Sequence, residues 1–201
     1  MLFSDTYLTI QQNAEALFKD KGSKFLAYAY PVENEQQVKE ILTALKKEHP
    51  SANHHCYAYR LGADKLNFRA NDDGEPSNTA GKPILGQIQS NDLTNLLIVV
   101  VRYFGGTLLG VSGLINAYKN SAADVIEASI IIEKQILFFY TVRFPFEQMN
   151  EVMKLLKQLD CKISQQEFDT HCEISFSIRK ANSEACEEKL RKIEGLKLDY
   201  R

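Results

Sequence analysis

The sequence predicts an α+β protein of two domains, and two patterns carry that prediction. Residues 96–101 are all apolar, and a glycine-rich loop and a helical pattern follow them, which is typical of a buried strand that leads into a helix. From residue 134 to 201, strand and helix patterns alternate in the order βαββαβ. A chain of 201 residues is long enough for two small domains. We therefore expect one domain over residues 1–130 and a second over residues 134–201.

The elements of the first domain follow from their local patterns. Segments rich in β-branched and aromatic residues predict strands. These strands are expected over residues 7–19, 25–32, 54–61, 65–70 and 96–101. Apolar residues at helical spacing predict a helix over 35–48, which Asn34 is placed to cap, and a shorter helix over 84–90. A further helical pattern runs from Leu114 to Val125, after the glycine-rich loop.

The second domain has a cleaner alternation. Apolar and polar residues alternate over 136–144, which predicts a half-buried strand. Further strands are expected over 161–168, 171–178 and 196–200, with a turn at Asp169-Thr170 between the first two. Helical faces run from Met149 to Leu159 and onward from Asn182, which is placed to cap the second helix. This order within about 68 residues predicts a ferredoxin-like sandwich, and fold alone implies no function.

Composition and charge exclude several classes of protein. The chain is 44% hydrophobic and 25% charged, as ordinary soluble globular proteins are. Its formal net charge of -2 gives no electrostatic sign of a DNA-binding or RNA-binding surface. The four cysteines show no CxxC spacing, which predicts reduced thiols. There is no signal-peptide pattern and no apolar run of membrane-spanning length, so we expect a cytoplasmic protein without a membrane partner.

The glycine-rich loop is the first candidate site. Gly105, Gly106, Gly110 and Gly113 lie between a buried strand and a helix. A helix N-terminus offers free N–H groups to an anion, and glycines let the backbone approach it closely. The alternative is that the glycines only form a tight turn, and their spacing alone favours this turn because it is neither the Walker pattern nor the dinucleotide-binding fingerprint.

The acidic loop, residues 71–83, is the second candidate. Asp72, Asp73 and Glu75 place three carboxylates close together, and Lys82 follows with a positive charge. Carboxylate oxygens suit a hard cation, but the spacing is not that of a calcium loop, so a solvated acidic turn is favoured and no metal is expected. A long loop near a glycine-rich loop is, in addition, a common place for a binding site.

Three further residues complete the candidates. Arg102 ends the buried strand, where it either binds a phosphate or carboxylate or pairs with Asp72 or Asp73 to hold the acidic loop. His54, or its neighbour His55, is a candidate general base, although an ordinary strand histidine is the favoured interpretation. Arg60, in the same strand segment, is the last candidate. No catalytic set and no cofactor site is recognisable in this pattern.

These motifs resemble those of the IMPACT family, in particular its bacterial, YigZ-type members. The resemblance rests on residues 81–110, which contain a first glycine, spaced aliphatic residues, Arg102, the Tyr103-Phe104 pair and the glycines of the loop. The segments 54–60 and 72–83 resemble two more family blocks, in the same order. The one departure is Asn78, where the family pattern leads us to expect glycine.

The resemblance implies a fold for each domain. The N-terminal domain is expected to share the left-handed βαβ fold of a small-subunit ribosomal protein, of domain IV of elongation factor G and of GHMP-type kinases. The C-terminal domain is expected to resemble the ferredoxin-like last domain of elongation factor G. Eukaryotic relatives regulate translation by competing for the activator of a stress-responsive kinase, with an RWD domain for which this chain has no room.

Two functions remain open at this point. The first is a translation regulator that binds the ribosome, RNA or translation factors through its glycine-rich loop and the open face of the C-terminal sheet. In that case Phe138, Tyr140 or Phe176 would stack on bases. The alternative is an enzyme that acts on a phosphorylated small molecule. The glycine-rich loop would be its phosphate site, Lys82 and Arg102 would neutralise the phosphate, and Asp72 or Asp73 would serve as a base or metal ligand. We favour binding over catalysis, because the family resemblance points to it and no catalytic set is recognisable.

Overall fold

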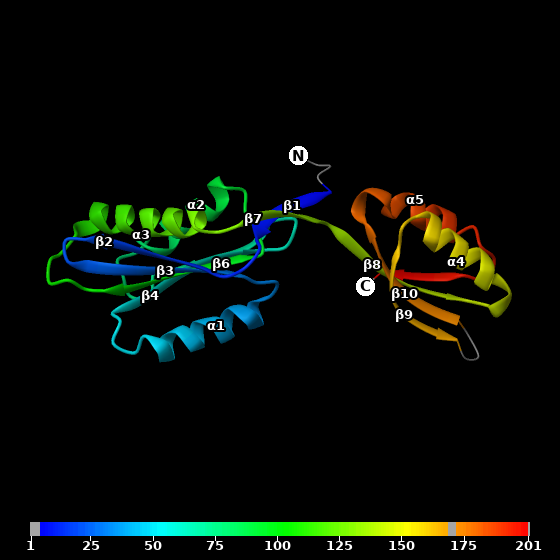
Figure 1. Ribbon diagram of the computed structural model, residues 1–201, viewed down its shortest axis with the longest axis horizontal. Coiled ribbons are helices and arrows are strands. Elements are labelled where there is room, and N and C mark those ends of the chain that lie inside the picture. The colour runs from blue at the N-terminus through cyan, green and yellow to red at the C-terminus, as the bar shows by residue number, and fades with distance from the viewer. Residues whose placement is uncertain (1–4, 169–171, 201) are drawn as a thin grey trace. The chain divides into compact units, whose positions relative to one another are not determined.

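The computed structural model describes residues 5–168 and 172–200. The described residues divide into two units, one formed by Tyr7–Lys134 and the other by residues 5–6 together with the described residues from Gln135 onward. Helices and sheets are mixed in the described residues (Figure 1), which confirms the expected combination of α and β structure. No helix in this part of the chain is long and apolar enough to cross a membrane.

The first unit is built on a five-stranded sheet in the order β2-β3-β6-β4-β5. Its strands are β2 (Ala14–Asp20), β3 (Ser23–Pro31), β4 (His54–Leu61), β5 (Asn67–Asn71) and β6 (Leu96–Tyr103). Every neighbouring pair is antiparallel. The all-apolar strand β6 lies in the middle, and its residues Leu96 to Val101 are fully buried. An unbroken apolar run is what a strand covered on both faces requires.

Helices cover the two faces of this sheet unequally. Helix α1 (Glu35–Glu48) lies on one face, while α2 (Gly81–Ser90) and α3 (Gly110–Glu127) lie on the other (Figure 1). Five strands about 4.8 Å apart span about 19 Å, whereas one helix with its side chains is about 10 Å wide. A single helix therefore leaves part of its face uncovered. On that face Leu17 of the edge strand β2 is 50% exposed.

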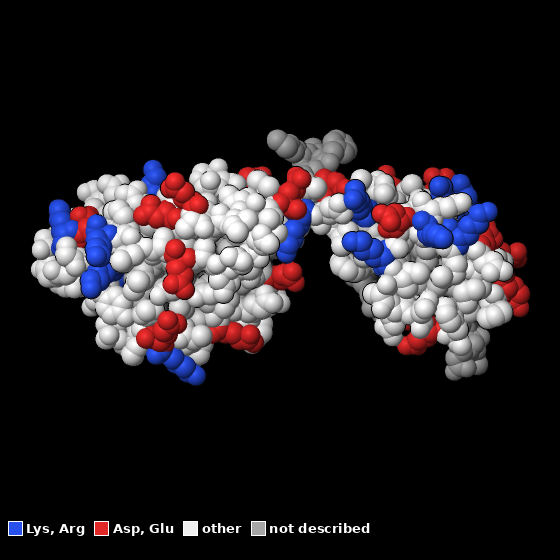
Figure 2. All heavy atoms as spheres, in the orientation of Figure 1, with Lys and Arg blue, Asp and Glu red and all other residues white. Residues whose placement is uncertain are grey.

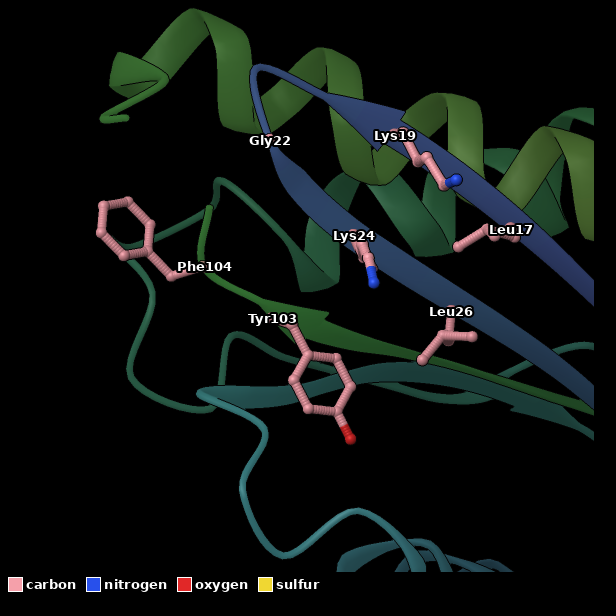
Figure 3. A pocket seen from close by; sticks show the side chains of 7 residues that line it. All are labelled: Leu17, Lys19, Gly22, Lys24, Leu26, Tyr103 and Phe104. Atoms are coloured by element: carbon pink, nitrogen blue, oxygen red, sulfur yellow. The ribbon is translucent and has the colours of Figure 1, made fainter. Parts of the chain in front are cut away.

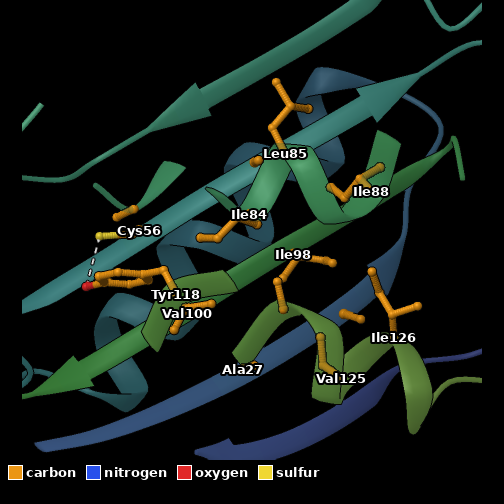
Figure 4. Packing of buried hydrophobic residues seen from close by; sticks show 14 of the residues in the cluster. Ala27, Cys56, Ile84, Leu85, Ile88, Ile98, Val100, Tyr118, Val125 and Ile126 are labelled. Carbon is orange, nitrogen blue, oxygen red and sulfur yellow. Dashed lines mark hydrogen bonds between the residues drawn. The ribbon is translucent and has the colours of Figure 1, made fainter. Parts of the chain in front are cut away.

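The core under α2 and α3 is the larger of the two in this unit. It combines apolar residues of the sheet, such as Val100, with Ile84 and Ile88 of α2 and Tyr118 of α3 (Figure 4). The core under α1 is formed around Val38, Leu45 and aromatic residues of β3 and β4. Helix α1 begins as predicted, because the Asn34 side chain accepts a hydrogen bond from the Gln37 N–H at 3.0 Å.

The expected strand over residues 7–19 is wrong in one respect, since two strands form there. Strand β1 (Thr6–Ile10) pairs with β7 (Ile131–Gln135) in a two-stranded sheet, and β2 begins only at Ala14. The break at residues 11–13 contains neither glycine nor proline, and Asn13 alone is a weak turn signal.

The second unit holds the elements β8 (Leu137–Phe144), the 3-10 turn η1 (Phe146–Gln148), α4 (Met149–Gln158), β9 (Lys162–Phe168), β10 (Cys172–Arg179), α5 (Lys180–Leu190) and β11 (Lys197–Tyr200). Their order is the expected βαββαβ, and the sheet has the antiparallel strand order β11-β8-β10-β9. The expected turn at Asp169-Thr170 lies outside the described residues.

The start of α5 differs from the prediction. The helix begins at Lys180, so Asn182 lies inside it and is not its cap. The Asp5 carboxylate instead accepts a hydrogen bond from the Ala181 N–H at 2.8 Å. A carboxylate at a helix N-terminus satisfies a free N–H group and interacts favourably with the helix dipole. The cap of α5 therefore comes from the opposite end of the chain.

Candidate functional site

The acidic loop between β5 and α2 is organised by the side chain of Asp72. One carboxylate oxygen accepts hydrogen bonds from the Ala80 and Gly81 N–H groups at 3.0 and 2.8 Å, and the other accepts from the Asn78 N–H at 2.9 Å. The residue that directly precedes α2, Ala80, has no side chain that can cap the helix. Asp72 provides this cap from farther back and folds the loop around itself.

Asp73 fastens the same loop to β4 and α1. Its carboxylate accepts a hydrogen bond from the His55 N–H at 2.7 Å and lies 3.4 Å from the Lys46 ammonium group. The Asp73 carbonyl oxygen lies 2.9 Å from Nδ1 of His54. Asp72 and Asp73, two of the three predicted acidic residues, therefore hold the shape of the loop.

Glu75 and Arg102 form a buried ion pair. The Arg102 Nη1 group lies 2.6 Å from the Glu75 Oε1 atom, and the two side chains are only 6% and 4% exposed. The Tyr118 hydroxyl donates to the same oxygen at 2.8 Å, and His54 Nε2 lies 3.8 Å away. Arg102 thus holds the acidic loop as one sequence hypothesis proposed, although its partner is Glu75 and neither Asp72 nor Asp73.

The rest of the Arg102 side chain contacts two more segments, the start of β3 and the residue that follows β6. Its guanidinium group lies over the Phe25 and Phe104 rings, 5.4 and 5.7 Å from their centroids. The Nη2 group donates to the Ser23 hydroxyl at 3.4 Å, and that hydroxyl oxygen accepts from the Gly105 N–H at 3.2 Å. We call Ser23, Glu75, Arg102 and Tyr118, with Cys56, the Arg102 network.

Cys56 extends the network toward the loop. Its Sγ atom lies 3.3 Å from the Tyr118 hydroxyl oxygen (Figure 4) and 2.9 Å from the Asp72 carbonyl oxygen, so the single thiol proton can be donated to either oxygen. Burial raises the pKa of the Cys56 thiol and, even more strongly, the pKa of Tyr118. Both groups are therefore neutral near pH 7, and Cys56 is not a reactive thiolate.

The four glycines of the glycine-rich loop have different roles. A Cβ atom at Gly105 would lie 1.9 Å from the Gly22 carbonyl carbon, so the loop can cross the β2–β3 turn only without a side chain. Gly106 and Gly110 have φ angles of 85 and 72°, in the left-handed region, and a Cβ atom added at either would point into open space. At Gly113, which lies in α3, a Cβ atom would lie 3.0 Å from the Leu109 Cβ atom.

The structure explains the one departure from the family pattern. Asn78 has a φ angle of 64°, which is a conformation that glycine adopts freely and asparagine tolerates better than most residues. Asparagine therefore preserves the shape of the acidic loop at this position.

Two predicted site residues lie apart from the Arg102 network. Lys82 is exposed on the first turn of α2 and forms no ion pair among the described residues. Arg60 binds the Lys65 and Leu93 carbonyl oxygens, at 3.3 and 3.4 Å, and so supports the β4–β5 turn. Within residues 5–168 and 172–200, no group of three or more His, Cys, Asp or Glu side chains is placed to hold a metal ion.

The C-terminal sheet does not present the aromatic residues that the sequence suggested. Tyr140 and Phe176 are 2% and 1% exposed and stack on each other in the core. Phe138 packs against this core, and the exposed ring on β8 belongs to Phe139. Buried rings cannot stack on bases, so Tyr140 and Phe176 are wrong candidates for RNA contacts.

A pocket that the sequence did not indicate lies beside the Arg102 network. It has a volume of about 490 Å³ and is on the sheet face that α1 leaves partly uncovered (Figure 3). Its lining residues are Leu17, Lys19, Gly22, Lys24, Leu26, Tyr103 and Phe104. The pattern of β2 is that of a strand with one buried and one exposed face. Only the fold shows that α1 does not cover the exposed face of β2.

Comparisons with known proteins agree with the motifs. The model of the Impact N-terminal domain matches residues 21–126. An IMPACT family member from Haemophilus influenzae is 35% identical over 170 residues, which are 82% of this chain and 81% of that protein. The IMPACT family member YigZ from Escherichia coli is 36% identical over 145 residues, which are 71% of each chain.

A solved structure supports the same assignment. The crystal structure of a hypothetical protein matches 98% of this chain and 97% of its own, with a TM-score of 0.76 and 29% sequence identity. The family model covers more than half of this chain, and the two relatives match two thirds of it or more at above 30% identity. The chain therefore belongs to the IMPACT family.

Proposed function

We propose that this protein is a non-catalytic binding protein of translation control, which contacts RNA, the ribosome or translation factors through its N-terminal unit. Membership of the IMPACT family supports the link to translation. The observation that carries the binding role is the Arg102 network. In it the charges of Arg102 and Glu75 compensate each other, and Tyr118 donates its hydrogen bond to the same carboxylate, so these groups are not free for catalysis. The loops that the network holds present apolar side chains to solvent, such as Leu108, which is 84% exposed.

The proposal includes the architecture that the resemblance implies. We assign residues 1–130 to an IMPACT-type domain with the left-handed βαβ fold of elongation factor G domain IV. We assign residues 134–201 to a ferredoxin-like domain. The βαββαβ order and the antiparallel strand order of the second sheet support the latter assignment.

The enzyme alternative needs groups that are already occupied. A phosphate site would need the charge of Arg102, but Glu75 compensates that charge at 2.6 Å. A catalytic base at Asp72 would need a free carboxylate, but three backbone N–H groups bind it. These contacts favour binding over action on a phosphorylated small molecule.

The test is capture of translation components by the tagged protein from a cytosolic lysate, with and without RNase. The exposed Leu108 of the glycine-rich loop is changed to serine, and Leu66→Ser serves as the matched control, because Leu66 is 77% exposed in the β4–β5 connection. We expect the wild type and Leu66→Ser to retain ribosomal subunits or translation factors, and Leu108→Ser to retain less. If the wild type retains none of them, the proposed function is wrong.

A further inference from the structure

We propose that the pocket beside the Arg102 network binds a nucleotide unit of single-stranded RNA, with Lys19 and Lys24 on its two flanking phosphates and Tyr103 and Phe104 beside the base. The choice of RNA as the polyanion rests on the function proposed above. The other features of the ligand, a flat ring next to a negative charge, follow from the pocket itself.

The strand register places the relevant side chains in one row. Lys19 of β2 is directly opposite Lys24 of β3, and Lys24 is directly opposite Tyr103 of β6. Residues opposite each other in an antiparallel pair point to the same face, with Cβ atoms about 5 Å apart. Leu17 and Leu26 form the neighbouring row across β2 and β3, so an apolar floor lies beside the two ammonium groups (Figure 3).

The two lysines form a like-charge pair without a carboxylate partner. Directly opposite like charges destabilise a sheet, and neither Lys19 nor Lys24 forms an ion pair among the described residues. Figure 2 shows Lys and Arg side chains gathered at the end of this unit where the β2–β3 turn lies. The two phosphates that flank a nucleotide, each with one negative charge, would neutralise both ammonium groups. This local charge is invisible in the net charge of -2.

The aromatic side of the pocket is fixed before any ligand binds. The Tyr103 hydroxyl lies 2.9 Å from His49 Nδ1, and that ring is held edge-on to the histidine. Phe104 is 45% exposed, while the Arg102 guanidinium lies against its ring. Tyr103 thus lies on the sheet and Phe104 on the loop that follows β6, and accessible aromatic rings are the usual platform for unstacked RNA bases.

The size and position of the pocket select the form of the ligand. About 490 Å³ is within the range of pockets for small ligands. A base inside a duplex is stacked on both sides and cannot enter such a pocket, whereas a single strand can turn a base out. Because β2 is an edge strand, the pocket is open at its side. A single-stranded RNA can therefore continue past the pocket on either side of the bound nucleotide.

The test is fluorescence anisotropy of the purified full-length protein with a fluorescein-labelled single-stranded RNA of roughly 10 nucleotides. The variant Lys19→Gln/Lys24→Gln removes the like-charge pair, and Lys39→Gln/Lys47→Gln removes the same charge from the exposed face of α1. Phe104→Leu removes the aromatic ring but keeps an apolar side chain, whereas Phe104→Trp keeps a ring that can stack. Circular dichroism confirms that each variant is folded.

We expect RNA binding by the wild type that weakens about seven-fold between roughly 50 and 200 mM salt, as two phosphate contacts on a single strand require. Lys19→Gln/Lys24→Gln should abolish most of this salt dependence, and Phe104→Leu should weaken binding by about five-fold or more. Lys39→Gln/Lys47→Gln and Phe104→Trp should bind as the wild type does.

The inference is overturned if the wild type does not bind the RNA, or if Lys19→Gln/Lys24→Gln binds it as tightly as the wild type. Capture from lysate separates this result from a failure of the proposed function. Translation components that are retained despite RNase, by a protein that binds no RNA, would overturn the pocket as an RNA site and leave the proposed function standing. RNA binding by a protein that captures no translation components would support the pocket as an RNA site and overturn the proposed function.

Discussion

Replacing Glu75 with glutamine should strongly destabilise the N-terminal unit. The change keeps the size of the side chain and an oxygen that accepts from Tyr118, but it removes the negative charge that faces Arg102. The Arg102 side chain is 6% exposed, so its charge is left without a partner and away from water.

The size of the effect follows from this burial. Removing one member of a buried ion pair costs about 3–5 kcal/mol, whereas an exposed pair contributes about 0–1 kcal/mol. The Nε group of Arg102 already lacks a hydrogen-bond partner, so the guanidinium has few alternative contacts. With a urea dependence of about 2 kcal/mol per M, the unfolding midpoint should fall by roughly 2 M.

Two native cysteines can report the unfolding of each unit separately. Cys56 in the N-terminal unit and Cys172 in the other unit are free thiols that are fully buried. Alkylation of each cysteine at increasing urea concentration, followed by mass spectrometry, gives a separate midpoint for each unit, which a single spectroscopic signal does not provide. Glu75→Gln should lower the midpoint of Cys56 and leave that of Cys172 unchanged.

The double variant Glu75→Gln/Arg102→Met completes the test. Since it removes both charges, it should regain most of the stability that Glu75→Gln loses. A loss of less than about 1 kcal/mol in Glu75→Gln, which is the cost expected for an exposed pair, would show that the buried charge is compensated in another way.

Three further predictions concern the same unit. Gly105→Ala should lower the Cys56 midpoint by at least as much as Glu75→Gln, because its Cβ atom would lie 1.9 Å from a backbone carbon; an unchanged midpoint would contradict the crossing of the two loops. Asn78→Val should cost about 1–2 kcal/mol because of the φ angle of 64°, whereas Asn78→Gly should be nearly neutral by the same measurement. Burial lowers the pKa of His55 below its usual 6.5. As the pH falls, the unfolded chain therefore binds a proton before the folded protein does, and the free energy of unfolding should decrease from about pH 7 to 5. His55→Gln should flatten this pH dependence of the Cys56 midpoint.

Local signals made most elements predictable. Helix α1 has the predicted bounds because its cap, Asn34, and its apolar face lie within one short segment. Strand β4 also has the predicted bounds. The prediction failed where the cause is distant in the sequence. The N–H groups at the start of α5 are bound by Asp5, and no local pattern distinguishes this from a cap at Asn182.

The candidate site was only partly accessible from the sequence. The sequence indicates that Arg102 is important, because it places a charge at the end of a buried strand. It does not identify the partner of Arg102, since Asp72, Asp73 and Glu75 lie close together in one loop. The structure distinguishes them because Asp72 and Asp73 bind backbone N–H groups, which leaves Glu75 for Arg102. The lysine–aromatic pocket was not predicted, because its residues converge only through the register of three strands.

The Asp5 cap has a consequence for how this protein can be dissected. The C-terminal unit is not a continuous stretch of sequence, since Asp5 and the residues from Gln135 onward belong to the same body. A fragment cut at residue 135 would leave the Ala181 N–H without its carboxylate, and would also lose the hydrogen bond from the Ile136 N–H to the Asp5 carbonyl oxygen. Deletion mapping of partners would then confuse a lost contact with a frayed helix, so point substitutions are the sounder tool.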